Sequence, residues 1–282
     1  MEKFIDLHTH STASDGSYSP GELIRHAKEK GLSAVALTDH DTVEGIEEAL
    51  KIGAEVGIEV IPGVEISVDY KPEMHILGYF LGDNYKNALS ILERLIENRN
   101  ERNPKIISKL NELGYDITMD EVKNEAKGKV VARPHVAKVL EKKGYVKSTD
   151  AAFERFLGFG KPAYFPKNRM TPEEGIREIL NAGGIPVLAH PIFLFPSMAQ
   201  LDLLLGELAK YGLMGIEAYY TDNTVKDTGN ILRLALKYNL LATGGSDFHG
   251  TFKPKIEIGS GYGNLKVPYE LLDKMKDAQK QA

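Results

Sequence analysis

The chain of 282 residues is long enough for one large domain or two ordinary ones, and its 42% apolar residues suffice for a sizeable core. A net charge of −5 argues against a broad nucleic-acid surface, and 27% charged residues without a long apolar run argue against a membrane span. The absence of cysteine excludes disulfides and thiolate metal sites. The N-terminus lacks the basic and apolar regions of a signal peptide, so we expect a cytoplasmic protein.

Short apolar strands alternate with amphipathic helices up to about residue 83. Strands are predicted at Phe4–Leu7, Ser33–Leu37, Glu59–Ile61 and His75–Phe80, and helices at Pro20–Lys30 and Val43–Val56. Ser19 is the expected N-cap of the first helix, and Pro62 and Gly63 are expected to follow the third strand. This alternation favours βα units in a parallel sheet, and polar residues at the strand ends are typical of a barrel with its site at one end.

The pattern changes after Asp83, where helices follow one another. Asn84–Asn111 is predicted as one long helix broken by Pro104, and Met119–Ala126, Arg133–Lys143 and Ala151–Leu157 as further helices. We therefore expect residues 84–162 to form a helical insertion over the end of the barrel that carries the site. Residues 1–83 and 163–282 are expected to form the catalytic barrel.

The strand and helix alternation returns at Pro162. Further strands are predicted at Pro162–Pro166, Ile185–Ala189, Ile216–Tyr220 and Leu240–Thr243. Helices are predicted from Thr171 to Gly183, and at Met198–Tyr211, Asn223–Tyr238 and Tyr269–Ala282. The whole pattern predicts an α/β fold.

Histidines and carboxylates gather at the predicted strand ends. His8 and His10 leave the first strand two residues apart, so both rings point to the same side, and Asp15 follows in a turn. The full set is His8, His10, Asp15, His40, Glu65, His75, His190, Asp247 and His249. His26, in the middle of a predicted helix, is expected to be structural.

Nine such groups at a buried barrel end would be costly unless metal ions neutralised them. Imidazole and carboxylate are common ligands of zinc, manganese and iron. Because about four to six ligands fill one coordination shell, the set predicts two or three divalent ions, with Glu65 as the bridge. We expect Mn²⁺ first, with Zn²⁺ or Fe²⁺ as alternatives. Closely spaced ions suit hydrolysis, and the lack of a P-loop or dinucleotide-binding glycine motif weakens a transferase or redox function.

The motifs HTHSTASDG, TDHD, GVEIS, AHP and GSDFHG occur in this order along the chain. In this order they resemble the PHP family, named for polymerase and histidinol phosphatase domains. The resemblance implies a distorted, TIM-like (β/α)7 barrel with two or three metal ions. It also implies three ligand sets: His8, His10, Glu65 and Asp247; Glu65, His75 and His190; and Asp15, His40 and His249.

The helical insertion, which contains RPHVAKVL, is similar to that of one branch of the family. These are phosphoesterases of nucleoside 3',5'-bisphosphates and of the 5' ends of short RNA. The resemblance implies a substrate with two phosphates, the second of which meets Arg133 and His135 at a helix N-terminus. Arg99 and Arg102 are further candidates for substrate binding, with a solvated helix face as the alternative. Lys167 is a weaker candidate.

We therefore expect a metal-bridged hydroxide to attack phosphorus. Asp247, His190 and His249 are the candidate catalytic residues, and the identity of the general acid stays open. The expected partner is a phosphorylated small molecule or short RNA, without membrane or extended nucleic-acid duplex, and the protein is expected to be a monomer.

Three alternatives differ in substrate or in kind. Histidinol-phosphate phosphatase would use the same chemistry on a smaller substrate. A metal-dependent amidohydrolase would cleave C–N bonds, but the sequence lacks a lysine at a strand end for carboxylation. The third is a metal-binding module of a polymerase, which is disfavoured because the sequence has no polymerase segment and an intact ligand set.

Overall fold

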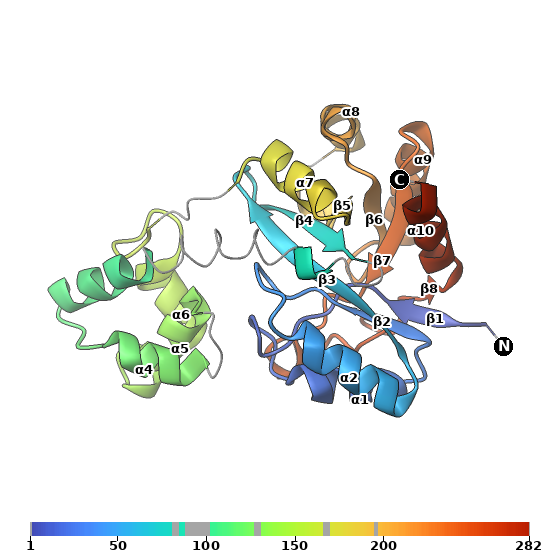
Figure 1. Ribbon diagram of the computed structural model, residues 1–282. Coiled ribbons are helices and arrows are strands. Elements are labelled where there is room, and N and C mark those ends of the chain that lie inside the picture. The colour runs from blue at the N-terminus through green and yellow to red at the C-terminus, as the bar shows by residue number, and fades with distance from the viewer. Residues whose placement is uncertain are drawn as a thin grey trace. The chain divides into compact units, whose positions relative to one another are not determined.

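The computed structural model describes residues 2–80, 85–87, 102–126, 131–165, 170–194 and 197–281 (Figure 1). The chain divides into two compact units, which we call the barrel unit and the helical unit. The barrel unit comprises Met1–Ile91 and Arg169–Ala282, and the helical unit comprises Leu92–Asn168. The predicted placement of the insertion over the end of the barrel stays a prediction.

One mixed sheet forms the barrel unit, with the strand order β7-β6-β5-β4-β3-β2-β1-β8. The strands are β1 (Phe4–Asp6), β2 (Ala34–Leu37), β3 (Glu59–Val68), β4 (Met74–Tyr79), β5 (Ile185–Leu188), β6 (Gly215–Tyr220), β7 (Leu241–Gly245) and β8 (Val267–Pro268). Strands β1 to β3 pair in parallel, as do β5 to β7, but β4 is antiparallel to β3 and β5, and β8 is antiparallel to β1. The prediction of a parallel sheet is therefore wrong at β4 and β8. The link between β3 and β4 is too short for a crossover helix, which leaves the antiparallel pairing.

Backbone hydrogen bonds join the chain beyond β1 to the chain at and beyond β7. Leu7 N donates to Gly244 O over 3.1 Å, and Asp247 N donates to His8 O over 2.9 Å. Two residues further along, His10 N donates to Phe248 O over 2.9 Å. These bonds draw the ends of the sheet together into a TIM-like barrel, as predicted, and place residues 8–10 beside residues 247–249.

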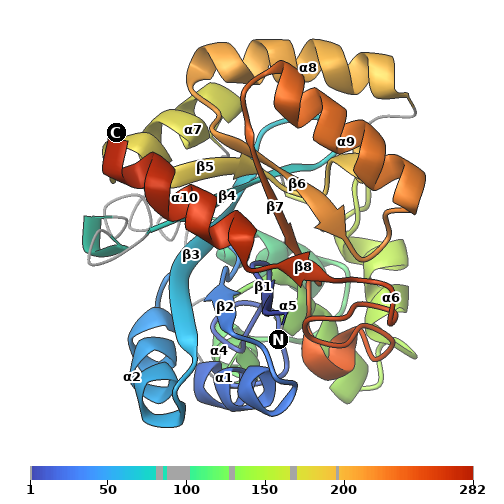
Figure 2. The ribbon, with the colours of Figure 1, turned by 90° about the vertical axis from the view of Figure 1, so that its right-hand side faces the viewer.

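Most helices of the barrel unit lie on the outer face of the sheet, and the last one runs across one end of the barrel (Figure 2). They are α1 (Pro20–Glu29), α2 (Ile46–Val56), α7 (Pro172–Asn181), α8 (Met198–Tyr211), α9 (Val225–Lys237) and α10 (Glu270–Gln281). Ser19 caps α1 as predicted, in a capping box with Glu22. Leu23 and Ile24 of α1 are buried in one cluster with Val35 of β2. Among the described helices, none combines the length and the apolar character that crossing a membrane requires.

Two predicted boundaries in the barrel unit are wrong by three residues or more, and one predicted strand does not form. The helix predicted from Val43 begins at Ile46, because residues 44–45 form a turn. The third strand does not stop before Pro62 but continues to Val68, and Pro62 O accepts a hydrogen bond from Phe80 N over 2.8 Å. No strand forms over residues 162–165, where the chain is in turns and irregular structure, and Pro166 lies outside the described residues.

The helical unit has a hydrophobic core of its own. Its described helices are 102–112, α4 (Met119–Ala126), α5 (Arg133–Lys142), α6 (Thr149–Ala152) and the π-helical turn η2 (Phe153–Leu157). Ile106, Leu110, Val136 and Leu140 are buried in one cluster with Leu157. Of the predicted helix Asn84–Asn111, the part from residue 102 is helical, residues 85–87 form a short 3-10 turn, and the remainder lies outside the described residues.

The contact between β7 and the chain after β1 can be tested at Gly245. A Cβ there would lie 2.3 Å from His8 Cβ and 2.4 Å from His8 N, so Gly245→Ala forces the two segments apart. We expect a loss of about 5 °C or more in melting temperature, measured by circular dichroism. Gly229→Ala in α9, where a Cβ meets nothing within 4 Å, is the control and should melt slightly higher than wild type. A Gly245→Ala protein as stable as wild type would contradict the close approach.

Candidate metal centre

The structure brings the nine predicted ligands together at one end of the barrel. They lie in or follow six strands: His8, His10 and Asp15 after β1, His40 after β2, Glu65 in β3, His75 in β4, His190 after β5, and Asp247 and His249 after β7. His8, His10 and Glu65 are 0% exposed. Their convergence depends on the ring of strands, because they are spread over most of the chain.

The first predicted ligand set surrounds one oxygen of Glu65. Glu65 Oε2 lies 3.2 Å from His8 Nε2 and 3.3 Å from His10 Nε2. Asp247 Oδ1 lies 3.2 Å from His10 Nε2 and 3.7 Å from His8 Nε2. Two imidazole nitrogens and two carboxylate oxygens therefore face one another.

The second predicted set gathers at the other oxygen of the same carboxylate. Glu65 Oε1 lies 2.9 Å from His75 Nδ1 and 3.0 Å from His190 Nε2. The two ring nitrogens lie 3.2 Å apart. Glu65 thus presents one oxygen to each of two groups of nitrogens.

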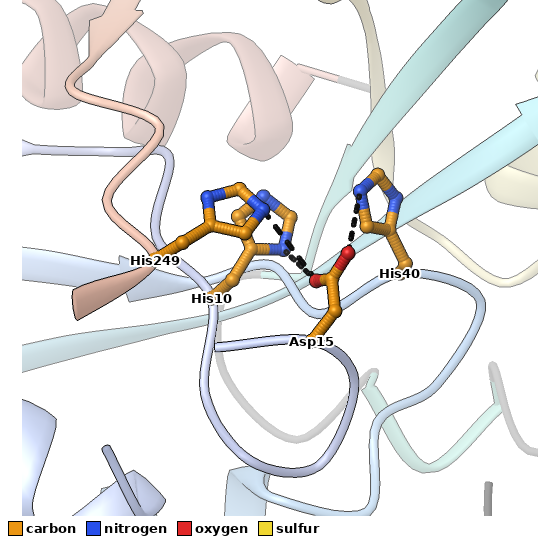
Figure 3. A group of neighbouring side chains, drawn as sticks. All are labelled: His10, Asp15, His40 and His249. Carbon is orange, nitrogen blue, oxygen red and sulfur yellow. Dashed lines mark ion pairs between the residues drawn. The ribbon is translucent and has the colours of Figure 1, made fainter. Parts of the chain in front are cut away.

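The third predicted set centres on Asp15 (Figure 3). Asp15 Oδ1 lies 3.5 Å from His249 Nε2, and Asp15 Oδ2 lies 3.9 Å from His40 Nε2. His10 Nδ1 also lies 3.9 Å from Asp15 Oδ1, and these four side chains together could hold a metal ion. The sequence prediction placed His10 only in the first set. His40 Nδ1 in turn lies 3.1 Å from Glu65 Oε2, so the three groups are continuous.

Glu217 is a central residue that the sequence analysis missed. This fully buried residue of β6 has its Oε1 3.0 Å from His8 Nδ1, and its Oε2 accepts the backbone N–H of His190 over 2.7 Å. A proton on His8 Nδ1 leaves Nε2 with a lone pair facing Glu65 and Asp247, which is the usual support of a metal-binding histidine. A lone charged residue inside the apolar run Ile216–Tyr220 was the signal in the sequence.

Two further buried carboxylates connect the loops that carry the cluster. Asp39 Oδ1 accepts from Ser11 N over 2.7 Å, and its Oδ2 accepts from Ser11 Oγ over 2.6 Å. Asp6 accepts from the backbone N–H groups of Ser246 and Gly259 over 2.9 and 2.7 Å. Asp39 thereby fixes the loop after β1, and Asp6 fixes the loop after β7.

His190 and Asp247 have strained backbones. His190 has φ of 26° and Asp247 has φ of 58°, in the region that favours glycine. Asp247 Oδ2 also accepts from Tyr220 Oη over 2.9 Å and from Lys253 Nζ over 2.7 Å. Such strain persists only where surrounding contacts over-determine the conformation, and it concentrates at functional sites.

The electrostatics of the cluster favour ionised carboxylates. Burial alone would raise the pKa of Glu65, but the charges of the adjacent His40, His75 and His8 outweigh it and hold that pKa well below its usual range. Burial likewise opposes ionisation of Asp247, yet hydrogen bonding to His10 and nearby positive charges lower its pKa. The pKa of His249 falls to about 4 because burial disfavours its charged form. The carboxylates are therefore anionic and His249 neutral near pH 7. Burial opposes protonation of His10 and His75, but the adjacent carboxylates outweigh it and raise the pKa of both rings to about 9, so a metal ion must displace a proton from these two rings.

The unsatisfied atoms of the cluster show that divalent cations fit it. His8 Nε2, both ring nitrogens of His10 and Glu65 Oε2 are buried without a hydrogen-bond partner among the described residues. Leaving such atoms unpaired costs free energy, on the order of 1–3 kcal/mol each. Nitrogen and carboxylate oxygen are the donors that first-row divalent metals prefer, so a cation would satisfy these atoms.

A cavity of about 620 Å³ opens beside the cluster. Its lining includes His75, His190, Asp247, Tyr220 and Lys253. This volume falls within the roughly 300–1,000 Å³ that small-molecule sites occupy. A substrate in the cavity would therefore contact the cluster directly.

The predicted substrate-binding residues belong to the other unit. Arg133 Nη1 donates to Leu157 O over 3.0 Å, and His135 Nδ1 accepts from Ala132 N over 3.0 Å at the start of α5. Arg102 is 4% exposed and its Nη2 donates to Asn103 Oδ1, so a solvated face does not describe it. Arg99 and Lys167 lie outside the described residues. The role of these residues in substrate binding stays a prediction.

A buried cluster of histidines and carboxylates at one end of a TIM-like barrel defines the chain as a metal-dependent hydrolase. The sequence places it more closely: the PHP domain model matches residues 6–158, and the chain belongs to that family. The resemblance identified from the motifs is thereby confirmed.

Three curated relatives match most of the chain. A 5'-3' exoribonuclease of Haemophilus influenzae is 36% identical, covering 88% of this chain and 91% of its own length. A phosphoribosyl 1,2-cyclic phosphate 1,2-diphosphodiesterase of Eggerthella lenta is 30% identical over 90% of this chain and 97% of its own. A 3',5'-nucleoside bisphosphate phosphatase of Chromobacterium violaceum is 31% identical over 90% of both chains. All three act on phosphate esters, and the present chain is likewise a hydrolase of phosphate esters.

Two solved structures are similar along nearly the whole chain. One is described as a metal-dependent phosphoesterase from Bifidobacterium adolescentis, with a TM-score of 0.82, 28% identity, and coverage of 97% of this chain and 95% of its own. The other is described as an amidohydrolase from Chromobacterium violaceum with bound sulfate, with a TM-score of 0.81, 28% identity, and coverage of 98% and 96%. The phosphate-ester names of the other relatives favour P–O over C–N cleavage.

Replacing Glu217, which accepts hydrogen bonds from His8 and His190, should weaken metal binding. Glu217→Gln keeps the shape of the side chain, but its amide nitrogen cannot accept one of the two hydrogen bonds from His8 and His190. We expect a Mn²⁺ dissociation constant about 10- to 100-fold higher, measured by calorimetric titration of chelator-treated protein. Glu207→Gln on the outer helix α8 is the matched control and should bind as wild type. Equal Mn²⁺ affinities for the Glu217→Gln and wild-type proteins would contradict the supporting role of Glu217.

Proposed function

We propose that the protein is a Mn²⁺-dependent phosphoesterase of nucleoside 3',5'-bisphosphates and of the 5' ends of short RNA. The observation that carries the proposal is the continuous contact of the nine predicted ligands, with Glu65 at their centre, next to a cavity of about 620 Å³. The names of the exoribonuclease and bisphosphate phosphatase relatives support the substrate class.

The three predicted ligand sets are the proposed places of the metal ions. Glu65 would contact two ions, since each of its oxygens faces a separate group of nitrogens. Asp15, His40 and His249, with His10 Nδ1, would hold the third ion. Ions bound there would lower the pKa of water and neutralise charge on phosphoryl oxygens.

The contacts of the cavity side chains decide which role we propose for each of them. Both oxygens of Asp247 are in contact with other groups, Oδ1 with His10 and Oδ2 with Tyr220 and Lys253. We therefore assign Asp247 to metal binding rather than to proton transfer. His190 and His249 also line the cavity, but their Nε2 atoms face Glu65 and Asp15 in the proposed ion sites, so we assign both to metal binding as well.

The proposal predicts that hydrolysis requires a bound divalent metal ion, which can be tested directly. We expect chelator-treated protein to lose hydrolysis of bis-p-nitrophenyl phosphate and to regain it with Mn²⁺. Glu65→Gln should lower kcat/KM by on the order of 100-fold or more, because one charge is removed where all three groups of donors meet. His26→Gln is the control, since His26 lies in α1, outside the three donor groups. Activity that resists the chelator, or survives in Glu65→Gln, would refute the proposal.

The substrate class is tested by competition between phosphate esters. We expect kcat/KM for adenosine 3',5'-bisphosphate to exceed that for histidinol phosphate. Arg133→Met should raise KM for the bisphosphate about tenfold while leaving that for p-nitrophenyl phosphate unchanged, because only the bisphosphate has a second phosphate to bind. Arg177→Met, at an exposed position of α7, is the matched control. Faster turnover of histidinol phosphate, or equal KM values in Arg133→Met, would contradict this assignment.

A further inference from the structure

Two lysines lie at the edge of the metal centre on the segment after His249. Lys253 Nζ is 2.7 Å from Asp247 Oδ2, and its side chain is 40% exposed. Lys255 is exposed two residues further along, and both lysines line the cavity beside the cluster. Neither residue was a candidate in the sequence analysis.

Contacts on both sides hold this segment in place. The turn η4 (Gly250–Phe252) begins directly after His249, and Thr251 N donates to Ser17 Oγ over 2.8 Å. Ile256 N donates to Lys253 O over 3.0 Å, and the Ile256 side chain is buried. The backbone that carries the lysines is therefore fixed at both ends, which limits the entropy lost when a ligand binds.

Among the described residues that line the cavity, carboxylates outnumber lysines. Four carboxylates line the cavity, namely Glu65, Glu73, Asp222 and Asp247. Lys253 and Lys255 are the permanently cationic side chains among the described residues that line it. An anion entering the cavity meets positive side-chain charge chiefly at this edge.

The geometry of Lys253 leaves donors for a ligand. An ammonium group has three N–H donors, and among the hydrogen bonds of the described residues Lys253 Nζ makes one, to Asp247. Asp247 Oδ1 faces the histidines of the cluster while Oδ2 takes the lysine. Lys253 therefore lies next to the predicted metal ligands and leaves Asp247 Oδ1, the oxygen that faces the histidines, without a contact to the lysine.

We propose that Lys253 and Lys255 form an anion subsite at the edge of the metal centre that binds a phosphate group of the substrate. Lys253 is the nearer donor because it contacts Asp247, and Lys255 extends the basic edge along the cavity. The assignment of the anion as phosphate rests on the proposed phosphoesterase function. The binding site itself is a property of the barrel unit and needs no residue of the helical unit.

Binding of inorganic phosphate tests the subsite without requiring turnover. We would titrate phosphate into Mn²⁺-loaded full-length protein by calorimetry and measure bound metal in the same samples. Lys253→Met and Lys255→Met should each raise the phosphate dissociation constant, by about tenfold for Lys253, the value of one charge-assisted hydrogen bond. Lys253→Arg should retain most of the affinity. Lys226→Met, exposed on α9 and outside the cavity lining, is the matched control.

Two outcomes would overturn the subsite. One is unchanged phosphate affinity in both lysine variants. The other is a loss of bound Mn²⁺ in Lys253→Met that accounts for the weaker phosphate binding, which would make Lys253 a positioning residue for Asp247 only. Failure of the proposed function would be seen separately, as absence of hydrolysis by wild-type protein that still binds phosphate through these lysines.

Discussion

The structure depends on the burial of one carboxylate among imidazole rings. Glu65 is fully buried, and its two oxygens lie within 3.3 Å of five ring nitrogens, those of His8, His10, His40, His75 and His190. A lone carboxylate at this depth would be strongly destabilising, and partners of opposite charge or coordinated cations compensate for it. The five rings come from β1, β2, β4 and β5 or from the residues directly after them, and these strands lie on both sides of β3, so the sheet must curve for this compensation to exist. Closure of the barrel then brings Asp247, after β7, to His8 and His10.

Hydrogen bonds to three further buried carboxylates, Glu217, Asp6 and Asp39, fix the orientation of the imidazole rings and of the loops that carry them. Glu217 contacts His8 Nδ1 and the backbone of His190, two residues from different strands. Asp6 and Asp39 accept hydrogen bonds from the loops after β7 and β1. These carboxylates orient the donor atoms before any cation binds, so that less reorganisation is required at the centre.

The predicted metal ligands and the predicted phosphate-binding Arg133 fall in different units of the chain. The barrel unit contains all nine predicted ligands, while the helical unit has its own core and carries Arg133 at the start of α5. Relatives that are similar over most of this chain are named for exoribonuclease, cyclic phosphate diphosphodiesterase and bisphosphate phosphatase activities.

Local sequence determined a great deal: the alternation of strands and helices, the helical unit, and the histidines and carboxylates that leave the strands in motif order. The antiparallel pairing of β4, the support from Glu217 and the contact of Lys253 with Asp247 were decided only by the tertiary structure. Periodicity and spacing report which way a side chain points along its own strand. Which strands become neighbours, and therefore which distant charges meet, depends on the closure of the whole sheet.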